Sequence, residues 1–225
     1  MNTMRSRLGK RWIWIVASLL AATTAVSALE RSLADDAIAV RPYEITEQRE
    51  PCDAFEEHRQ PFFGDTHVHT AYSFDASAQD TRNTPVDAYR FAKGEPMGIQ
   101  PYSVDGAPLR TVQLLRPLDF VAVTDHAEFL GEVSLCMTPG TWSYWHPMCV
   151  AHRNIPNVAL MVMALRTIVL KSRWGFCGED GIDCLDRARG VWAESIAAAQ
   201  GAYDRSSACS FTSFIAYEWT ASVGQ

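Results

Sequence analysis

Residues 118–126 read Leu-Asp-Phe-Val-Ala-Val-Thr-Asp-His, an apolar run that ends abruptly in two side chains of the metal-ligand type. Apart from Asp119, the run shows no polar alternation, which is typical of a parallel strand buried on both faces. Active sites of parallel α/β folds are built at the carboxyl edge of the sheet. We therefore expect His126 to be a ligand, and Asp125 to act in catalysis by orienting ligands or moving protons. The alternative is that Asp125 caps a following helix and His126 is a loop residue.

A second strand is predicted over residues 61–69, which read Pro-Phe-Phe-Gly-Asp-Thr-His-Val-His. Side chains alternate along a strand, so Asp65, His67 and His69 share one face. A lone histidine usually has a structural explanation. Two histidines on one face beside a carboxylate favour a metal site, where the carboxylate binds the metal or orients an imidazole.

A third strand is predicted over the aromatic and β-branched residues 211–220, which contain Glu218. A carboxylate among apolar side chains is costly to bury unless it is paired or metal-bound. Glu218 is therefore either a metal ligand or one half of an ion pair.

A helix is predicted to begin after Thr84, which can cap it, with Pro85 at its first position and Gly94 at its end. Within residues 98–113, the pair Asp105-Gly106 indicates a hairpin or a loop.

Residues 131–210 read as an insertion with two helices. The first, over residues 158–170, is strongly apolar, but Arg166 and its short length predict a buried helix rather than a membrane span. The second is expected over residues 189–200. Strands that alternate with helices imply an α/β fold.

The chain has 225 residues, with 20 Lys and Arg against 26 Asp and Glu, a formal net charge of -6. No basic cluster follows the first few residues, which excludes a nucleic-acid binder. Arg5–Arg11 is basic, Trp12–Ala22 is apolar, and Val26-Ser27-Ala28 resembles a cleavage site. Residues 1–28 thus read as a secretory signal peptide and residues 29–60 as an irregular lead-in.

The competing interpretation of the leader is an uncleaved N-terminal anchor, which its short apolar core disfavours. Contact with a membrane is expected only in that case. Either way, the rest of the chain is expected to be exported, to the periplasm or the medium.

The number of cysteines is even, which suggests disulfides in an oxidising compartment. They are Cys52, Cys136, Cys149, Cys177, Cys184 and Cys209. A structural zinc site is the weaker alternative, because no Cys-x-x-Cys pair occurs. We expect local pairing of Cys136 with Cys149 and of Cys177 with Cys184.

Together these segments resemble the PHP (polymerase and histidinol phosphatase) superfamily, in particular its exported bacterial branch of unknown function. The resemblance rests on residues 64–76, 84–92, 116–131 and 211–220, which occur in the family's order. It implies a distorted β/α barrel that holds two or three divalent metal ions, often zinc, manganese or iron. It also implies an exported hydrolase that cleaves a small-molecule phosphoester with metal-activated water.

The resemblance also implies a set of metal ligands. They are His67, His69, Asp75, His126 and Glu218. The family continues with further histidine ligands and a late Asp-x-His motif. We therefore expect residues 61–225 to be the N-terminal part of such a domain, an incomplete barrel that is inactive alone. Two alternatives stay open: a metal-binding module without turnover, and an amidohydrolase-like enzyme that cleaves C–N or ester bonds.

Overall fold

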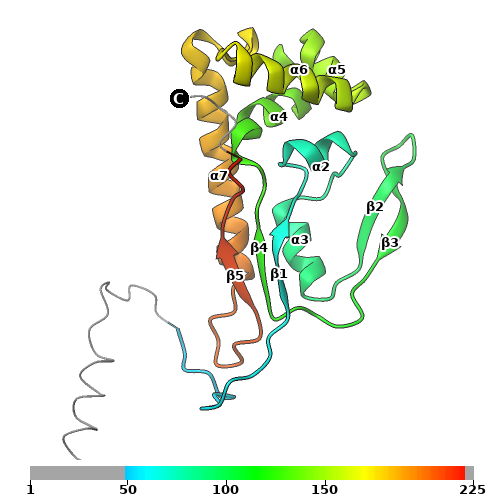
Figure 1. The fold of residues 1–225 in the computed structure, drawn as a ribbon. Helices are drawn as coiled ribbons and strands as arrows, with labels where there is room; N and C mark the ends of the chain where they lie inside the picture. The colour runs from blue at the N-terminus through cyan, green and yellow to red at the C-terminus, as the bar shows by residue number, and fades with distance from the viewer. Residues whose placement is uncertain (1–48, 221–225) are drawn as a thin grey trace, which may run out of the picture. The chain divides into compact units, whose positions relative to one another are not determined.

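A parallel sheet carries the three segments that contain the candidate ligands (Figure 1). The computed structural model describes residues 49–220. The strand order is β1 (Gly64–Val68), β4 (Phe120–Val123), β5 (Thr212–Ile215), and both pairings are parallel. The central strand β4 is buried, with Val121 only 1% exposed. The prediction of a buried parallel strand is confirmed.

Helix α3 (Pro85–Ala92) begins and ends where the sequence predicts. The Thr84 hydroxyl accepts from the Asp87 backbone N–H, and the Asp87 carboxylate accepts from the Thr84 N–H at 2.9 Å. This reciprocal pair satisfies two free backbone donors at the start of the helix. Gly94 follows the last turn with φ +92°, a conformation that glycine adopts without strain.

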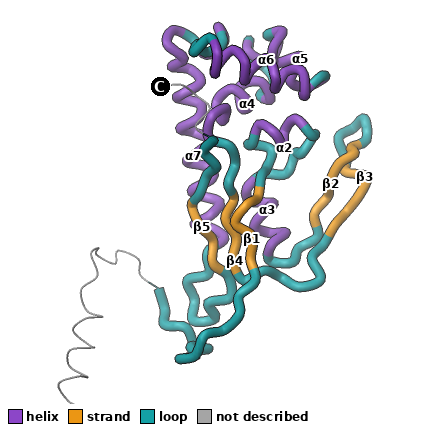
Figure 2. Tube along the Cα trace, in the orientation of Figure 1, coloured by secondary structure: helices purple, strands orange, loops and turns teal. Residues whose placement is uncertain are grey.

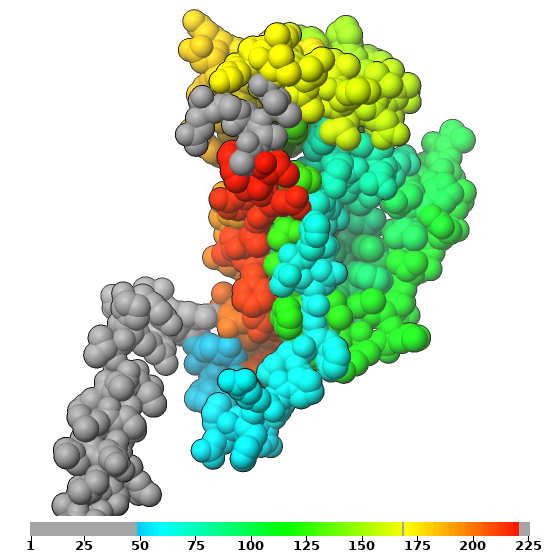
Figure 3. Space-filling view, in the orientation of Figure 1, coloured from blue at the N-terminus to red at the C-terminus, as the bar shows by residue number. Residues whose placement is uncertain are grey.

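One face of the sheet is covered by α3 and by the long helix α7 (Ile182–Ala202), as Figure 2 shows. Tyr89 of α3 and three alanines of α7 pack there against Val121, Val123 and Phe211. Figure 3 shows β5, β4 and β1 side by side on the other face, which carries the half-exposed Phe214. Burial of apolar area on the helix side holds this α/β unit together.

The remaining helices lie beyond the carboxyl ends of the strands (Figure 1). They are α2 (Phe74–Ala78), α4 (Leu130–Met137), α5 (Pro147–Asn154) and α6 (Pro156–Val169). Short 3-10 turns occur at η1 (Ala127–Phe129), η2 (Ser143–Trp145), η3 (Gly175–Cys177) and η4 (Glu179–Gly181). Buried side chains of these helices and turns form a second core, which includes Phe74, Met163 and Phe176.

The structure contains both predicted local disulfides, Cys136–Cys149 and Cys177–Cys184. A third, Cys52–Cys209, spans a sequence separation of 157 and ties the lead-in to the loop before β5. Three disulfides are characteristic of a protein from an oxidising compartment.

Helix α6 differs from its prediction as a buried helix. Its inner side is enclosed, with Ala159 and Met163 at 0% exposure, but Met161 on its outer side is 66% exposed. Among the described residues α6 packs against α5 and α2, and its exposures show that the outer side stays open to solvent.

Asp105-Gly106, predicted to mark a hairpin or a loop, lies in the turn of a hairpin between β2 (Met97–Tyr102) and β3 (Pro108–Val112), which pair antiparallel. The third predicted strand is shorter than expected, since β5 ends at Ile215. Beyond β5, Glu218 forms an isolated parallel bridge with His126.

The α/β class is confirmed, while residues 49–220 contain a three-stranded and a two-stranded sheet and no closed barrel. In the described part of the chain no helix is both long and apolar enough to cross a membrane. The predicted leader, residues 1–28, lies outside the described residues.

Candidate metal centre

Each strand of the parallel sheet delivers one candidate ligand just past its last residue. His69 follows β1, His126 follows β4, and Glu218 follows β5. The Glu218 N–H donates to the Asp125 carbonyl at 3.1 Å, and the Ala127 N–H donates to the Glu218 carbonyl at 3.0 Å. These bonds hold the backbone of Glu218 beside His126, although regular pairing has already ended.

Three imidazoles surround the Glu218 carboxylate. Its Oε2 lies 2.9 Å from His67 Nε2 and 2.9 Å from His69 Nε2, and its Oε1 lies 3.6 Å from His126 Nε2. The His69 ring is 4.8 Å from that of His67 and 4.9 Å from that of His126. The structure thus brings together the predicted ligands from all three strands.

Asp75 joins the cluster from helix α2. Its Oδ2 lies 2.8 Å from His69 Nδ1 and 3.9 Å from His126 Nε2. The Ser73 hydroxyl and the Ala76 N–H donate to its Oδ1 at 2.6 and 2.8 Å. Asp75 is therefore held at one place and fixes the ring of His69 through Nδ1.

Opposite charges within the cluster shift the pKa of His69 and of both carboxylates. Burial alone would lower the pKa of His69, but the hydrogen bonds and charges of Asp75 and Glu218 outweigh it and raise the pKa. For Glu218, burial opposes ionisation, yet His126, His69 and His67 together lower the pKa. In Asp75, burial is likewise outweighed by Ser73, His69 and Ala76, and the pKa is lowered. The carboxylates are ionised, as metal ligands must be.

Five side chains form two overlapping groups with ligand spacing. His67, His69 and Glu218 form one group, and His69, Asp75 and His126 the other. The ligand atoms within each group lie within 4.8 Å of one another. Imidazole and carboxylate donors at such distances suit zinc, manganese or iron.

Glu128, two residues after His126, is a buried carboxylate. Its Oε1 accepts from the backbone N–H of Thr220 at 2.5 Å. Among the described residues its Oε2 has no hydrogen-bond partner, and it lies 3.5 Å from His126 Nδ1. A buried carboxylate on the outer nitrogen of an imidazole is the usual support of a metal-bound histidine. The residues present therefore fit a metal site.

Asp125, the predicted catalytic residue, is 5% exposed. Its Oδ1 accepts from the Thr70 N–H at 2.5 Å and its Oδ2 from the Thr70 hydroxyl at 2.8 Å. Burial raises the pKa of Asp125 against the opposing effect of Thr70. These bonds fasten the segment after His69 to the end of β4, and a direct catalytic role stays a prediction.

Asp65, which shares a strand face with the histidines, accepts from the His67 backbone N–H at 2.9 Å.

Glu132 forms a third group with Cys177 and Cys184 at ligand spacing. Those cysteines are joined in a disulfide and Glu132 is paired with Arg173. This third group is therefore a structural one.

The model of one protein family, described as "Protein of unknown function (DUF3604)", matches residues 56–225. The chain belongs to this family. No curated protein and no solved structure matches it. The relation to the PHP superfamily therefore stays a prediction.

A cavity of about 620 Å³ in this DUF3604 chain runs along β1 beside the cluster. His67 and His69 line one part of it, and apolar residues including Phe91, Ile99 and Leu118 line the rest. The His67 side chain is 72% exposed, so the cluster is open to solvent on this side.

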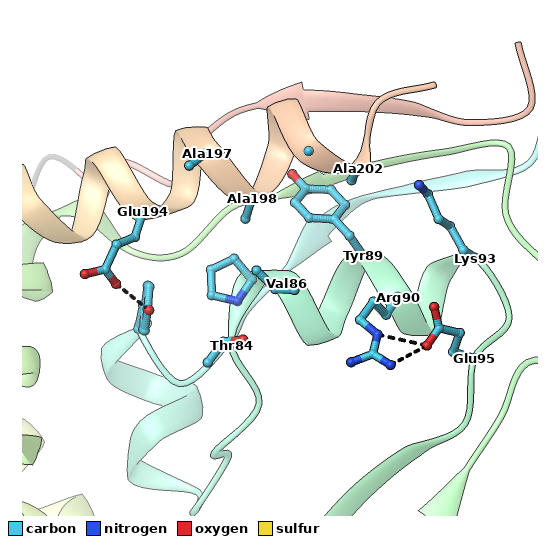
Figure 4. A pocket seen from close by; sticks show the side chains of 13 residues that line it. Thr84, Val86, Tyr89, Arg90, Lys93, Glu95, Glu194, Ala197, Ala198 and Ala202 are labelled. Atoms are coloured by element: carbon cyan, nitrogen blue, oxygen red, sulfur yellow. Dashed lines mark hydrogen bonds and ion pairs between the residues drawn. The ribbon is translucent and has the colours of Figure 1, made fainter. Parts of the chain in front are cut away.

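A second cavity, of about 600 Å³, lies between α3 and α7 (Figure 4). Both acidic groups of this cavity have partners within it: Glu194 accepts from the Tyr72 hydroxyl, and Glu95 pairs with Arg90. The Lys93 ammonium, which also lines the cavity, lies over the Phe211 ring. Burial and the Glu194 hydrogen bond raise the pKa of Tyr72 to about 12. These paired groups give the cavity no candidate ligand set.

Proposed function

We propose that this chain carries part of the active site of an exported metal-dependent hydrolase of the PHP type, a phosphoesterase. The single observation that supports this proposal is the convergence of His67, His69, His126 and Glu218 from three neighbouring strand ends. The Nε2 atoms of the three histidines lie between 2.9 and 3.6 Å from the carboxylate oxygens of Glu218. A structural role alone does not account for three imidazoles at one open edge.

We also propose that the parallel sheet is part of a distorted β/α barrel. The parallel order β1-β4-β5, with α3 and α7 on one face, supports this arrangement. In such barrels the active site lies at the carboxyl ends of the strands, where this cluster lies.

His67, His69, His126 and Glu218 would hold the cations, with Asp75 as a further ligand. A bound divalent cation lowers the pKa of water and polarises a phosphoryl oxygen. Glu128 faces the outer nitrogen of His126, which directs the Nε2 atom of this ring toward the centre of the cluster. Asp125 anchors the backbone of that same loop through Thr70.

The cavity along β1 would take the organic part of the substrate. It begins at His67 and His69 and continues over apolar side chains. A small phosphoester fits such a site, because its anionic end would face the cluster while its organic part leaves water.

Cation binding by the full chain is the first test. Titration with zinc or manganese should show binding that Glu218→Gln and His69→Asn weaken by about a hundredfold, because each removes a ligand. The matched control is His58→Asn, which removes an exposed histidine of the lead-in and should leave binding unchanged. Equal affinity in all four proteins would refute the site.

Binding of vanadate, a mimic of the phosphoryl group in transfer, tests the substrate class separately. We expect vanadate to bind the metal-loaded chain and to bind neither the chelated protein nor Glu218→Gln. Cation binding without oxyanion binding would instead favour a metal-binding module. A panel of phosphoester and amide substrates, assayed on the loaded protein, separates phosphoesterase from C–N hydrolase activity.

A further inference from the structure

The outer side of helix α6 is an apolar stripe exposed to water. Its members lie at helical spacing on one side, opposite the enclosed Ala159 and Met163. The stripe consists of Val158, Met161, Val162, Leu165, Val169 and Leu170, each between 41% and 66% exposed. Contiguous exposed apolar surface of this kind is unusual in a soluble protein and marks a contact surface.

The charge around the stripe is the reverse of the charge of the whole chain. The chain has an excess of acidic residues, yet no Asp or Glu occurs between Val133 and Gly178. The same stretch contains Arg153, Arg166, Lys171 and Arg173. Lys171 is exposed directly after the last turn of α6. Of these four cations only Lys171 is exposed, because Arg173 pairs with the buried Glu132 and the other two arginines donate to backbone carbonyls. A partner that meets the stripe therefore meets a positive charge at Lys171.

The chemistry of the stripe's side chains indicates which class of partner it can bind. Protein interfaces are enriched in Tyr, Trp and Arg and carry about one hydrogen bond per 100–200 Å². The stripe offers only aliphatic and thioether groups, without a hydrogen-bonding side chain. Acyl chains need no hydrogen bonds, and a flanking lysine can reach the anionic headgroups above them.

Two exposed tryptophans in the same segment are consistent with a lipid partner. Trp142 is 65% exposed and Trp145 is 72% exposed, in the turn before α5. Tryptophan is enriched at membrane–water boundaries because its ring is apolar and its N–H is polar.

We infer that α6 docks this chain onto the surface of an anionic lipid bilayer, with its axis along the membrane plane and its apolar stripe among the acyl chains. Lys171 would then face the headgroups. Because α6 packs against α2, which carries Asp75, docking would hold the histidine cluster close to the bilayer (Figure 1). The inference does not depend on the proposed hydrolase activity.

The test is hydroxyl-radical footprinting of the full chain, with and without vesicles of phosphatidylglycerol and phosphatidylethanolamine. This readout is resolved by residue, so binding through the N-terminal apolar segment does not obscure it. We expect vesicles to lower the oxidation of Met161 about tenfold, because buried side chains lose contact with solvent radicals. Leu109 in the β2–β3 hairpin, 63% exposed, should be oxidised equally in both samples.

Two matched variants complete the experiment. Leu165→Glu places a charge in the stripe and should restore the oxidation of Met161 to its vesicle-free level, whereas Leu109→Glu should leave its protection intact. Met161 oxidation that vesicles do not change would overturn the inference. So would protection that grows with protein concentration in the absence of vesicles, because the occupant would then be a second copy of the chain.

Discussion

Two buried carboxylates beside His126 have different environments, and their contacts give them different tasks. Both oxygens of Asp125 accept hydrogen bonds from Thr70, so this residue joins two strand ends. Glu128 has one oxygen bound to Thr220 and one free oxygen that faces the His126 ring. A buried carboxylate oxygen without a partner is costly unless a cationic or donor group lies nearby. His126 is that group, and it becomes a better donor when its other nitrogen binds a cation.

We predict that Glu128→Gln weakens cation binding by about ten- to a hundredfold, because the His126 ring loses its anionic support. Isothermal titration with zinc provides the measurement. Glu57→Gln, at an exposed position of the lead-in, is the control with the same change of charge. Unchanged affinity in Glu128→Gln would show that Glu128 does not support His126.

At the scale of elements, helices α4 and α7 approach each other closely. A Cβ atom built on Gly131 of α4 would lie 1.9 Å from the Cys184 carbonyl oxygen of α7. The two helix backbones can approach this closely only because Gly131 has no side chain. This contact fixes the helices beyond the sheet to the helix that covers it.

The variant Gly131→Ala should therefore lower the free energy of unfolding by about 1–3 kcal/mol or more, since the added methyl group pushes the helices apart. Gly190→Ala on α7 is the matched control, because no atom in the described part of the chain lies within 4 Å of a Cβ built on Gly190. It should raise the free energy of unfolding by about 0.5–1 kcal/mol through helix propensity. Urea unfolding measures both values, and an equal effect of the two substitutions would contradict the close contact.

Helices α2 and α5 meet at the buried ring of His152. The ring is 2% exposed, stacks on Phe74 at 5.8 Å, and lies 3.2 Å from the Ser77 hydroxyl. Within residues 49–220 its Nδ1 has no hydrogen-bond partner. Burial, helped by the charge of Arg153, lowers the pKa of His152 to about 4. The folded protein therefore holds this ring in the neutral form.

This lowered pKa predicts a loss of stability in acid. The unfolded chain binds a proton near pH 6.5 and the folded chain only near pH 4, so stability is complete above 6.5 and falls as the pH drops between these values. The loss is about 1.4 kcal/mol per pH unit, and about 3 kcal/mol in all. Urea unfolding from pH 7 to pH 4.5 should show a smaller slope for His152→Gln than for the wild type. Parallel slopes would mean that His152 does not titrate in this range.

At the scale of the whole molecule, the candidate ligands come from segments that are far apart in the chain. His69 and Glu218 are separated by 149 residues, and each stands at the end of a different strand. A cation that binds all of them binds only the folded arrangement, so its binding free energy adds to the stability of the fold.

We predict that zinc at a hundredfold excess over its Kd raises the free energy of unfolding by about 2.7 kcal/mol, and that a chelator removes this gain. The same zinc concentration should add far less to Glu218→Gln. Thermal or urea unfolding followed by circular dichroism measures the effect. Equal stabilisation of the wild type and Glu218→Gln would place the bound zinc elsewhere.

Several features of this protein are determined by short stretches of sequence alone. The bounds of α3 follow from Thr84, Pro85 and Gly94, because caps act within one turn of a helix. The strand β4 follows from an unbroken apolar run, and the two local disulfides follow from closely spaced cysteines. The residue types of the cluster could also be chosen from sequence, since imidazoles and carboxylates at strand ends are recognisable one strand at a time.

Other features were decided only by the tertiary structure. The pairing of Asp125 with Thr70 joins residues 55 positions apart. One oxygen of Glu128 accepts from Thr220, which lies far later in the chain, and this contact leaves the other oxygen facing His126. The open outer side of α6 depends on which neighbours reach it, which its own apolar sequence does not specify. Capping and strand propensity act over a few residues, whereas burial and partner choice depend on where distant segments come to lie.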